Sequence, residues 1–315
     1  MIAASTDFSL QPRQTFHSEE ATYRVVERVG NGGNSNVYIC QAVNGKSRGM
    51  LFAAKFMVNV AKADRVARFE SELEFLAKTD HPAIIRVFDS GTHTFGPAGK
   101  KVDVPFYVSE YLPKTLRDAM RAGMQMLDKV TVAVNILSAL MYMSQSSVSI
   151  IHRDIKPENI FFRGRAAVLG DFGLLKALDA SELGERFDIG KLSGGVRHPY
   201  MYPTPELIDY AKDDTKIVTA KSDVFQLGIV LAELFCGDHP IRPRAKPLDP
   251  IIVDVLSTFS GSNSLAIRQL VEQMLELDVN RRAAAEDSYD RWEGIFFEVV
   301  NDAQRLEGVA YGSRG

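Results

Sequence analysis

The sequence predicts an α+β fold in two parts: a small, mostly antiparallel β-sheet with one helix, followed by a larger and mainly helical part. Three observations favour this division. Short runs rich in β-branched residues, separated by Gly and Asn turns, fill much of residues 23–110. Within that region, residues 63–78 carry apolar side chains at three- and four-residue spacing. After Pro113 the apolar runs lengthen and take on helical spacing.

The elements of the sheet part follow from local composition. The turn at residues 44–49 (Asn-Gly-Lys-Ser-Arg-Gly) predicts a hairpin between two strands. The helix at residues 63–78 is expected to end at His81-Pro82, because the residue before a proline disfavours helical backbone. The expected strands are residues 23–29, 36–43, 50–58, 84–89 and 106–110.

The second part is expected to contain mostly helices. Four regions of the chain follow from the change in pattern: an arm over residues 1–20, the sheet part over 21–112, the helical part over 113–301 and a tail over 302–315. The arm is polar and without periodicity, which is typical of a flexible segment; an arm ordered by docking within the chain is the alternative. The expected helices are residues 115–120, 128–144, 222–235, 250–258, 264–276 and 284–301, with short strands at 160–162 and 167–169.

Composition excludes several classes of function. The chain has 315 residues, 45% of them hydrophobic, and a net charge of −3, so no basic field favours a nucleic-acid partner. Two cysteines, Cys40 and Cys236, are too few for a disulfide framework or a Cys-rich zinc site, and they favour a cytoplasmic setting. The most apolar windows, residues 130–143 and 224–235, are short and interrupted by polar residues, so no membrane insertion is expected.

A glycine cluster joins the first two strands of the sheet part. Gly30, Gly32 and Gly33 permit tight backbone geometry and close approach to phosphate oxygens. A plain hairpin turn is the alternative. A dinucleotide-binding turn does not fit, because the cluster leads into a strand rather than a helix.

Lys55 lies among apolar neighbours in the third expected strand. A buried ammonium needs a partner, because an unpaired buried charge is costly. Glu72 on the following helix could supply it, and such a pair could hold the α- and β-phosphates of ATP. An edge-strand lysine that faces water is the alternative.

The segment His152-Arg153-Asp154-Ile155-Lys156-Pro157-Glu158-Asn159 carries the most specific signal. In this loop Asp154 can orient a hydroxyl and accept its proton, Asn159 can hold a metal ion, and Lys156 can offer positive charge to a transferred phosphoryl group. The downstream tripeptide Asp171-Phe172-Gly173 adds a carboxylate suited to Mg²⁺, which prefers oxygen ligands and bridges phosphates.

These motifs, in this order, resemble those of the eukaryotic-type Ser/Thr protein kinase superfamily over about residues 20–300. The resemblance implies a two-lobed fold, with the sheet part as N-lobe and the helical part as C-lobe. Thr204-Pro205-Glu206 is similar to the family's Ala-Pro-Glu, and Arg282 to the buried partner of its glutamate. Asp223 is similar to the aspartate that braces the catalytic loop, here residues 152–159.

The same resemblance implies the chemistry of the site. ATP and Mg²⁺ or Mn²⁺ would be the cofactors, with Lys55, Glu72, Asp154 and Lys156 catalytic and Asn159 and Asp171 on the metal. The backbones of Glu110 and Leu112 would bond adenine. Ser109 would be a small gatekeeper, and Lys156 is typical of Ser/Thr rather than Tyr kinases. The nucleotide-contacting residues would be Gly30, Gly32, Gly33, Val37, Ala53, Lys55, Glu110, Leu112 and Phe161.

The chain also departs from the family pattern. Ser35 stands where the third glycine of the loop is expected, and no Gly-Thr pair is recognisable at residues 194–199. If phosphorylation regulates the activation segment (residues 171–206), Ser193 is the first candidate and Ser181 the second; unmodified loop serines are the alternative.

Three hypotheses therefore remain open. The first is a protein kinase acting on Ser/Thr residues of protein substrates and of itself, with a regulatory partner possible through the N-terminal arm or the activation segment. The second is a kinase-fold scaffold that binds nucleotide without catalysis. The third is a phosphotransferase acting on a small molecule.

Overall fold

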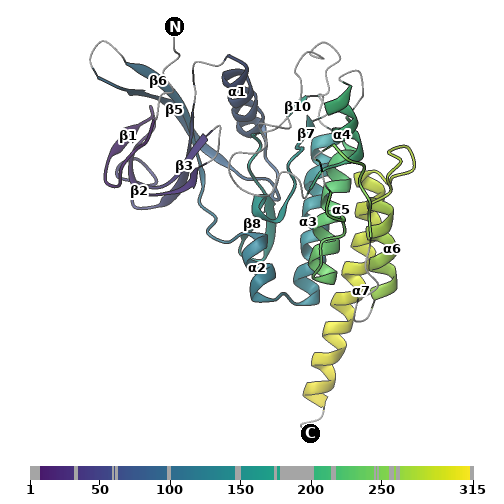
Figure 1. Ribbon diagram of the computed structural model, residues 1–315. Helices are drawn as coiled ribbons and strands as arrows, with labels where there is room; N and C mark the ends of the chain where they lie inside the picture. The colour runs from purple at the N-terminus through teal and green to yellow at the C-terminus, as the bar shows by residue number, and fades with distance from the viewer. Residues whose placement is uncertain are drawn as a thin grey trace. The chain divides into compact units, whose positions relative to one another are not determined.

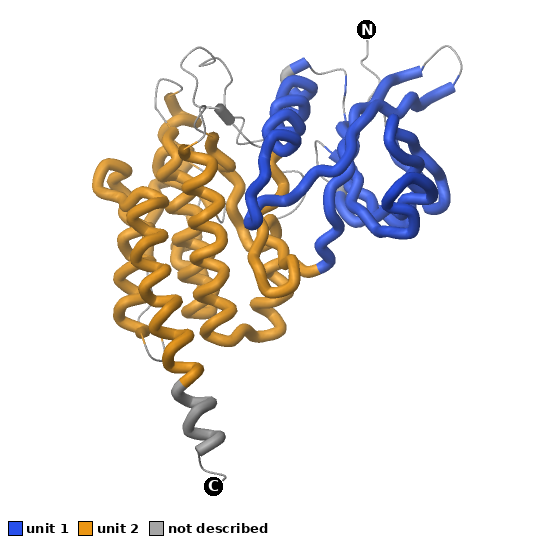
Figure 2. The backbone as a smooth tube through the Cα atoms, turned by 180° about the vertical axis from the view of Figure 1, so that it is seen from behind, with its two compact units in different colours: residues 1–113 blue, residues 114–315 orange. Residues whose placement is uncertain are grey.

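The structure is a computed structural model. It describes residues 8–31, 35–58, 60, 63–97, 101–145, 150–173, 176–177, 202–213, 218–244, 246, 248–254, 259 and 263–312. The chain divides into two compact units, residues 1–113 and 114–315, coloured separately in Figure 2. The fold class is confirmed: an antiparallel sheet with one helix makes up the first unit, and helices dominate the second.

The first unit is built on one six-stranded sheet (Figure 1). Its strand order is β1-β2-β3-β4-β6-β5, and every neighbouring pair is antiparallel. The helix α1 lies between β4 and β5 in sequence. The elements are β1 (Thr15–His17), β2 (Thr22–Asn31), β3 (Ser35–Ala42), β4 (Leu51–Met57), α1 (Ala63–Lys78), β5 (Val87–Phe95) and β6 (Val102–Glu110).

One face of this sheet carries an aromatic core. The Phe16 ring is fully buried and contacts the rings of Tyr23, Phe56 and Phe106, with centroids 4.9–5.2 Å apart. Phe8 packs on Phe56 with its ring centroid at 5.1 Å. Aromatic contacts of this kind add to the free energy gained from burying the rings.

The arm expected over residues 1–20, either flexible or ordered by docking, is docked on the sheet through buried residues between 8 and 16. Leu10 is buried with Phe8 and Phe16 in the core, and its N–H donates to the Tyr38 hydroxyl at 3.0 Å. Asn36 donates to the Phe8 carbonyl at 2.6 Å. The apolar residues of this segment are too few and too widely spaced to give a periodic signal, but tertiary packing orders them.

The second unit is mainly helical (Figure 1). Its central helix, α5, is buried along most of its length, and Gly228 lets α6 approach closely: an added Cβ there would lie 3.0 Å from the Met274 Cβ. The elements are α2 (Leu116–Ala122), α3 (Met126–Gln145), β7 (Ile150–Ile151), the 3₁₀ turn η1 (Pro157–Asn159), β8 (Ile160–Arg163), β9 (Ala166–Leu169), β10 (Lys176–Ala177), α4 (Pro205–Lys212), α5 (Lys221–Cys236), α6 (Ser264–Met274) and α7 (Ala285–Gly312).

Three features of this unit differ from the expectations. Residues 250–254 are not helical, and Val253 instead bridges Ile241. The expected tail at 302–315 is helical as far as Gly312, as part of α7. The helix α4 was not predicted; its N-cap is Thr204, whose hydroxyl accepts from the Leu207 N–H at 3.2 Å.

Within the described residues, α3 is the one helix long and apolar enough to cross a membrane by length and composition. Buried core helices pass the same test. Eight apolar side chains of α3, from Val130 to Met143, are buried, and the helix contacts α5, α7 and β9. These contacts are those of a core helix.

Candidate active site

A buried ion pair occupies the first unit. The Lys55 ammonium on β4 lies 2.7 Å from Glu72 Oε1 on α1, and the two side chains are 10% and 2% exposed. Tyr107 on β6 donates its hydroxyl to the same Glu72 oxygen at 2.9 Å. Lys55 and Tyr107 are direct partners in the sheet, and the ammonium lies 5.8 Å from the centre of the Tyr107 ring. The predicted pair is present, and the edge-strand alternative is excluded.

The sheet places other predicted residues on the face that carries Lys55. Val37 pairs directly with Lys55, and Ala53 with Ile39, two positions along β3 from Val37. Directly opposed residues point to the same side of an antiparallel sheet, so Val37, Ala53 and Lys55 share one face. Gly30 pairs with Val37, and a Cβ on Gly30 would lie 3.3 Å from the Val37 Cβ. Gly32 and Gly33 lie outside the described residues.

The two predicted adenine-binding residues lie at the end of β6. Glu110 is the last residue of that strand, and its N–H donates to the Arg86 carbonyl at 3.0 Å. Its carboxylate accepts from the Arg86 N–H at 2.9 Å. Leu112 follows in a segment without regular secondary structure and is partly buried. The Ser109 side chain, the predicted gatekeeper, is buried.

In the second unit, two side chains of α5 hold the backbone of the catalytic loop. The Asp223 carboxylate accepts from the N–H groups of His152 at 2.8 Å and Arg153 at 2.9 Å. Gln226 accepts from the Ile155 N–H at 3.0 Å and donates to the Arg153 carbonyl at 3.0 Å. Backbone groups that would otherwise need water are thus paired inside the protein.

Asp154, Lys156 and Asn159 meet within this loop. Lys156 Nζ lies 2.7 Å from Asp154 Oδ2, and Asn159 Nδ2 donates to the same oxygen at 2.9 Å and to the Asp154 carbonyl at 2.8 Å. Among the described residues, both side-chain bonds fall on Oδ2. Oδ1 takes part in neither of these bonds.

The loop and the following Asp171-Phe172-Gly173 motif contain two left-handed residues. Arg153 has φ +64° and Asp171 has φ +55°, values uncommon for residues other than glycine. Packing sustains this backbone, since buried Phe172 lies against the His152 ring with centroids 4.6 Å apart. His152 also lies 3.1 Å from the Gly170 carbonyl. Such strain concentrates at functional sites.

Burial raises the pKa of two aspartates, Asp154 in the catalytic loop and Asp223 on α5. Burial raises the pKa of the Asp154 carboxyl, and the Asp171 charge adds to this, while Lys156 and the Asn159 hydrogen bond oppose it. Burial raises the pKa of Asp223 to about 7, against the hydrogen bonds from His152 and Arg153. Perturbed carboxyl groups that cluster in this way are typical of catalytic sites.

The predicted metal ligands are hard oxygen donors. The Asn159 amide nitrogen is committed to Asp154, which leaves the amide oxygen as its ligand atom. Asp171 is exposed. Among the described residues no group of three or more His, Cys, Asp or Glu side chains could hold a metal. One carboxylate and one amide oxygen nevertheless fit Mg²⁺, which keeps several waters and is bound jointly with substrate phosphates.

A second buried ion pair anchors α4. Arg282 is fully buried and pairs with Glu206 in the first turn of α4. It also donates to the carbonyls of Glu276 at 2.8 Å and Lys221 at 2.9 Å, and its guanidinium lies 4.6 Å from the centre of the Phe225 ring. One side chain therefore joins α4, α5 and the segment between α6 and α7, as the Glu206–Arg282 resemblance predicted.

Phe161 lies in β8, where it bridges Thr115 and pairs with Val168. The candidate phosphorylation sites Ser181 and Ser193 lie outside the described residues. Sequence reasoning missed the supporting roles of Tyr107, His152 and Gln226. The position of Tyr107 opposite Lys55 follows only from the pairing of β4 with β6, which the sequence does not give. Gln226 lies three positions after Asp223, a spacing that places both side chains on one face of a helix and that could have indicated its role.

The comparison with known families agrees with this geometry. A model of the protein kinase domain matches residues 23–291. This match covers most of the chain and includes the Lys55–Glu72 pair, the catalytic loop and Arg282. The chain belongs to the protein kinase family.

Its relatives include named Ser/Thr kinases. The chain is 32% identical over 225 residues to the probable serine/threonine-protein kinase PknB of Bifidobacterium longum, covering 69% of this chain and 30% of that protein. It is 32% identical to the serine/threonine-protein kinase PknB of Mycobacterium tuberculosis, with 69% and 33% covered. A putative L-type lectin-domain containing receptor kinase of Arabidopsis thaliana is 29% identical, with 79% and 35% covered. The chain thus spans about a third of the length of these relatives.

Proposed function

We propose that this chain is a Ser/Thr protein kinase that transfers the γ-phosphoryl group of ATP to hydroxyl groups of protein substrates, including its own. The observation that carries the proposal is the Asp154 carboxylate, fixed through Oδ2 by Lys156 and Asn159, with Oδ1 left for an acceptor hydroxyl. Named Ser/Thr kinases among the relatives support the same activity.

The first unit would bind the nucleotide. Lys55, held by Glu72, would place its ammonium on the α- and β-phosphates. Val37 and Ala53 share its sheet face and would contact the adenine ring. The ion pair is already formed, so little side-chain entropy is lost when ATP binds.

The second unit would act on the acceptor. Asp154 orients the hydroxyl and accepts its proton, and a raised pKa brings this carboxyl closer to the working pH of a general base. Lys156 lies beside it and would stabilise negative charge on the transferred group. Mg²⁺ or Mn²⁺, held by Asn159 and Asp171, would neutralise the phosphate charges.

The proposal is tested by comparing the wild-type chain with Asp154→Ala, using radiolabelled ATP and a general protein substrate. We expect incorporation of label into protein by the wild type and its near loss in the variant. Lys212→Ala, at the end of α4, is a control that should retain activity. Nucleotide binding without Asp154-dependent transfer would indicate a scaffold, and labelling of a small molecule alone would indicate a different phosphotransferase.

A cytoplasmic location is part of the proposal. It is supported by the two cysteines: both are free, and burial raises the pKa of the Cys40 thiol to about 12, which disfavours reactivity. We also propose that the chain binds no nucleic acid and does not insert in a membrane. A regulatory partner would act through the activation segment or through the N-terminal arm, whose residues 11–15 are exposed between buried Leu10 and Phe16.

A further inference from the structure

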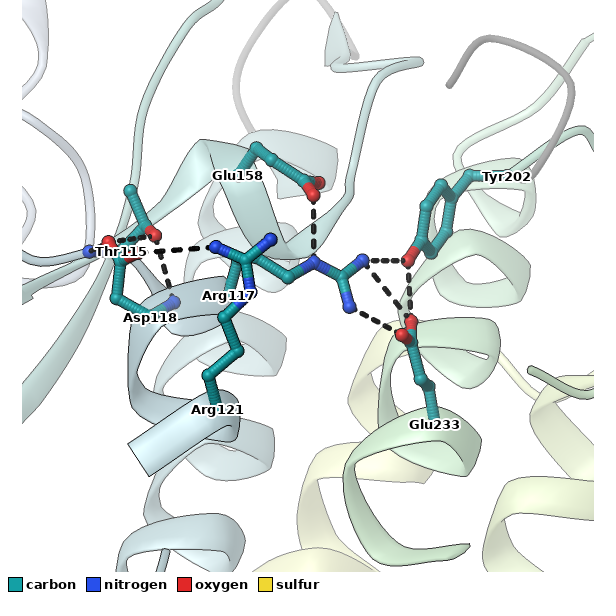
Figure 3. Close-up of polar contacts among 7 residues, drawn as sticks. All are labelled: Thr115, Arg117, Asp118, Arg121, Glu158, Tyr202 and Glu233. Carbon is teal, nitrogen blue, oxygen red and sulfur yellow. Dashed lines mark hydrogen bonds and ion pairs between the residues drawn. The ribbon is translucent and has the colours of Figure 1, made fainter. Parts of the chain in front are cut away.

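Arg117 lies at the centre of a polar cluster in the second unit (Figure 3). Its Nε lies 2.8 Å from Glu158 Oε1, and one Nη donates to the Tyr202 hydroxyl at 2.7 Å. It also pairs with Glu233, which accepts the Tyr202 hydroxyl proton at 2.6 Å. The Arg117 side chain is 16% exposed, so this cluster is largely shielded from solvent screening.

The cluster reaches the catalytic loop at its C-terminal end. Glu158 belongs to the 3₁₀ turn η1 and directly precedes Asn159, which hydrogen-bonds to Asp154. Among the described residues, the buried oxygen Glu158 Oε2 has no hydrogen-bond partner. The Glu158 carboxylate therefore depends on Arg117 to hold its position.

The same cluster is tied to the loop's N-terminal end through Tyr202. The Tyr202 carbonyl accepts from Gln226 at 2.8 Å, and Gln226 also bonds the backbone of Arg153 and Ile155. Tyr202 is therefore joined to the start of the loop by its carbonyl and to the end of the loop by its hydroxyl, through Arg117.

Arg117 is itself held in place by its helix. Thr115 and Asp118 form a reciprocal capping box that fixes the first turn of α2, where Arg117 lies (Figure 3). The residues before the helix are tied to β8, since Thr115 bridges Phe161 and Phe162 donates to the Lys114 carbonyl at 3.0 Å. A fixed helix turn makes the guanidinium a preorganised donor, with five N–H groups in a rigid fork.

We propose that Arg117 is a positioning residue for phosphoryl transfer, which holds Glu158 and Tyr202 together and so sets the placement of Asn159 and Asp154. This inference rests on the proposed kinase activity. Arg117 touches no reacting atom. Its removal should lower kcat by a larger factor than it raises KM for ATP, because the predicted nucleotide-contacting residues of the first unit are untouched and only the metal ligand Asn159 is displaced.

The test uses Arg117→Ala, with Arg121→Ala as a matched control on the same helix. Arg121 is 74% exposed, and among the described residues its ion pair is with Asp118 at 4.0 Å. We expect kcat to fall by between about 10- and 100-fold in Arg117→Ala, since displacement of a catalytic group by about 1 Å has an effect of this order. Arg121→Ala should retain the wild-type kcat. Millimolar guanidinium should restore part of the lost rate in Arg117→Ala and have no such effect on the control.

Arg117→Ala also leaves Glu233 without its cation, which could unfold the chain. The double variant Arg117→Met/Glu233→Gln removes the charges of this pair and should recover part of the lost stability in thermal denaturation without recovering kcat, because Glu158 still lacks its cation. A wild-type kcat in either folded variant, or equal losses for Arg117 and Arg121, would overturn the inference. An inactive wild type would instead overturn the proposed activity itself.

Discussion

Lys55 illustrates how one residue depends on partners far away in sequence. Its ammonium is paired with Glu72 from a helix and lies near the Tyr107 ring from another strand. Removing one member of a buried pair leaves the other charge uncompensated, which costs more than the pair contributes.

Replacing Lys55 with Met should nearly abolish turnover, because the phosphates lose their cation. The unfolding free energy should fall by about 3 kcal/mol, since Glu72 stays buried and loses its ion-pair partner. Radiolabelled ATP incorporation and urea denaturation measure the two effects. The double variant Lys55→Met/Glu72→Gln should recover much of the stability and none of the turnover. A wild-type rate in either variant would mean that Lys55 has another role.

For single residues, the sequence was a better guide to the proposed catalytic residues than to the residues that hold them in place. The expected Lys55–Glu72 pair is present, and Asp154, Lys156 and Asn159, which were chosen from one motif with fixed spacing, contact one another. The Arg117 cluster was not predicted. Its members come from α2, η1, α5 and the residue before Pro203, and no local pattern relates such distant segments.

At the scale of elements, the catalytic loop depends on α5. Asp223 accepts two loop N–H groups from inside the protein, where burial opposes its ionisation and raises its pKa to about 7. In an unfolded chain the pKa of an aspartate is about 3.9. The folded state therefore binds this proton more tightly than the unfolded state does.

The Asp223 proton should contribute most to the unfolding free energy below about pH 4, and this contribution should be lost as the pH rises to about 7. This one group should change the unfolding free energy by no more than about 1.4 kcal/mol per pH unit. Urea denaturation of the wild type and Asp223→Asn at several pH values isolates this term, because the asparagine does not titrate. A difference that grows more favourable to the wild type with rising pH would mean that the two N–H bonds outweigh burial.

Secondary structure was predicted correctly where the apolar periodicity extends over many residues. It was predicted wrongly where tertiary contacts determine the conformation of a short run. The helices α1, α3 and α5 lie where apolar spacing predicted them. The apolar run at residues 250–258 suggested a helix, yet residues 250–254 form a bridge to Ile241. A short apolar run of this kind is compatible with a helix or with extended backbone, and here the contact with the neighbouring segment favours the extended form.

At the scale of the whole molecule, the chain forms two compact units, residues 1–113 and 114–315. The core of the first unit includes Phe8, Leu10 and Phe16, although the family match begins only at residue 23. The folding unit is therefore larger than the region shared with the family. Residues outside a homologous region can contribute to the stability of the domain beside it.

Deleting residues 1–18 should destabilise the first unit and leave the second intact. Amide hydrogen exchange should accelerate in β2–β6 and stay unchanged in α3 and α5, because the lost contacts lie in the sheet core. If the shortened chain aggregates, Phe16→Ala should give the same pattern with a loss of about 3–5 kcal/mol. Glu19→Ala, at an exposed position, is its control. Unchanged exchange in the sheet would show that the segment is dispensable.

The strand β1 also bears on the association of this protein with other copies of itself. β1 pairs with β2 and contacts β5, the strand at the other edge of the sheet, and Tyr23 of β2 bonds Asp89 of β5 at 2.7 Å. Open sheet edges are templates for pairing with other chains. Because the edge strands β1 and β5 lie against each other, we expect less of their backbone to be available for pairing with another copy than in a fully open sheet.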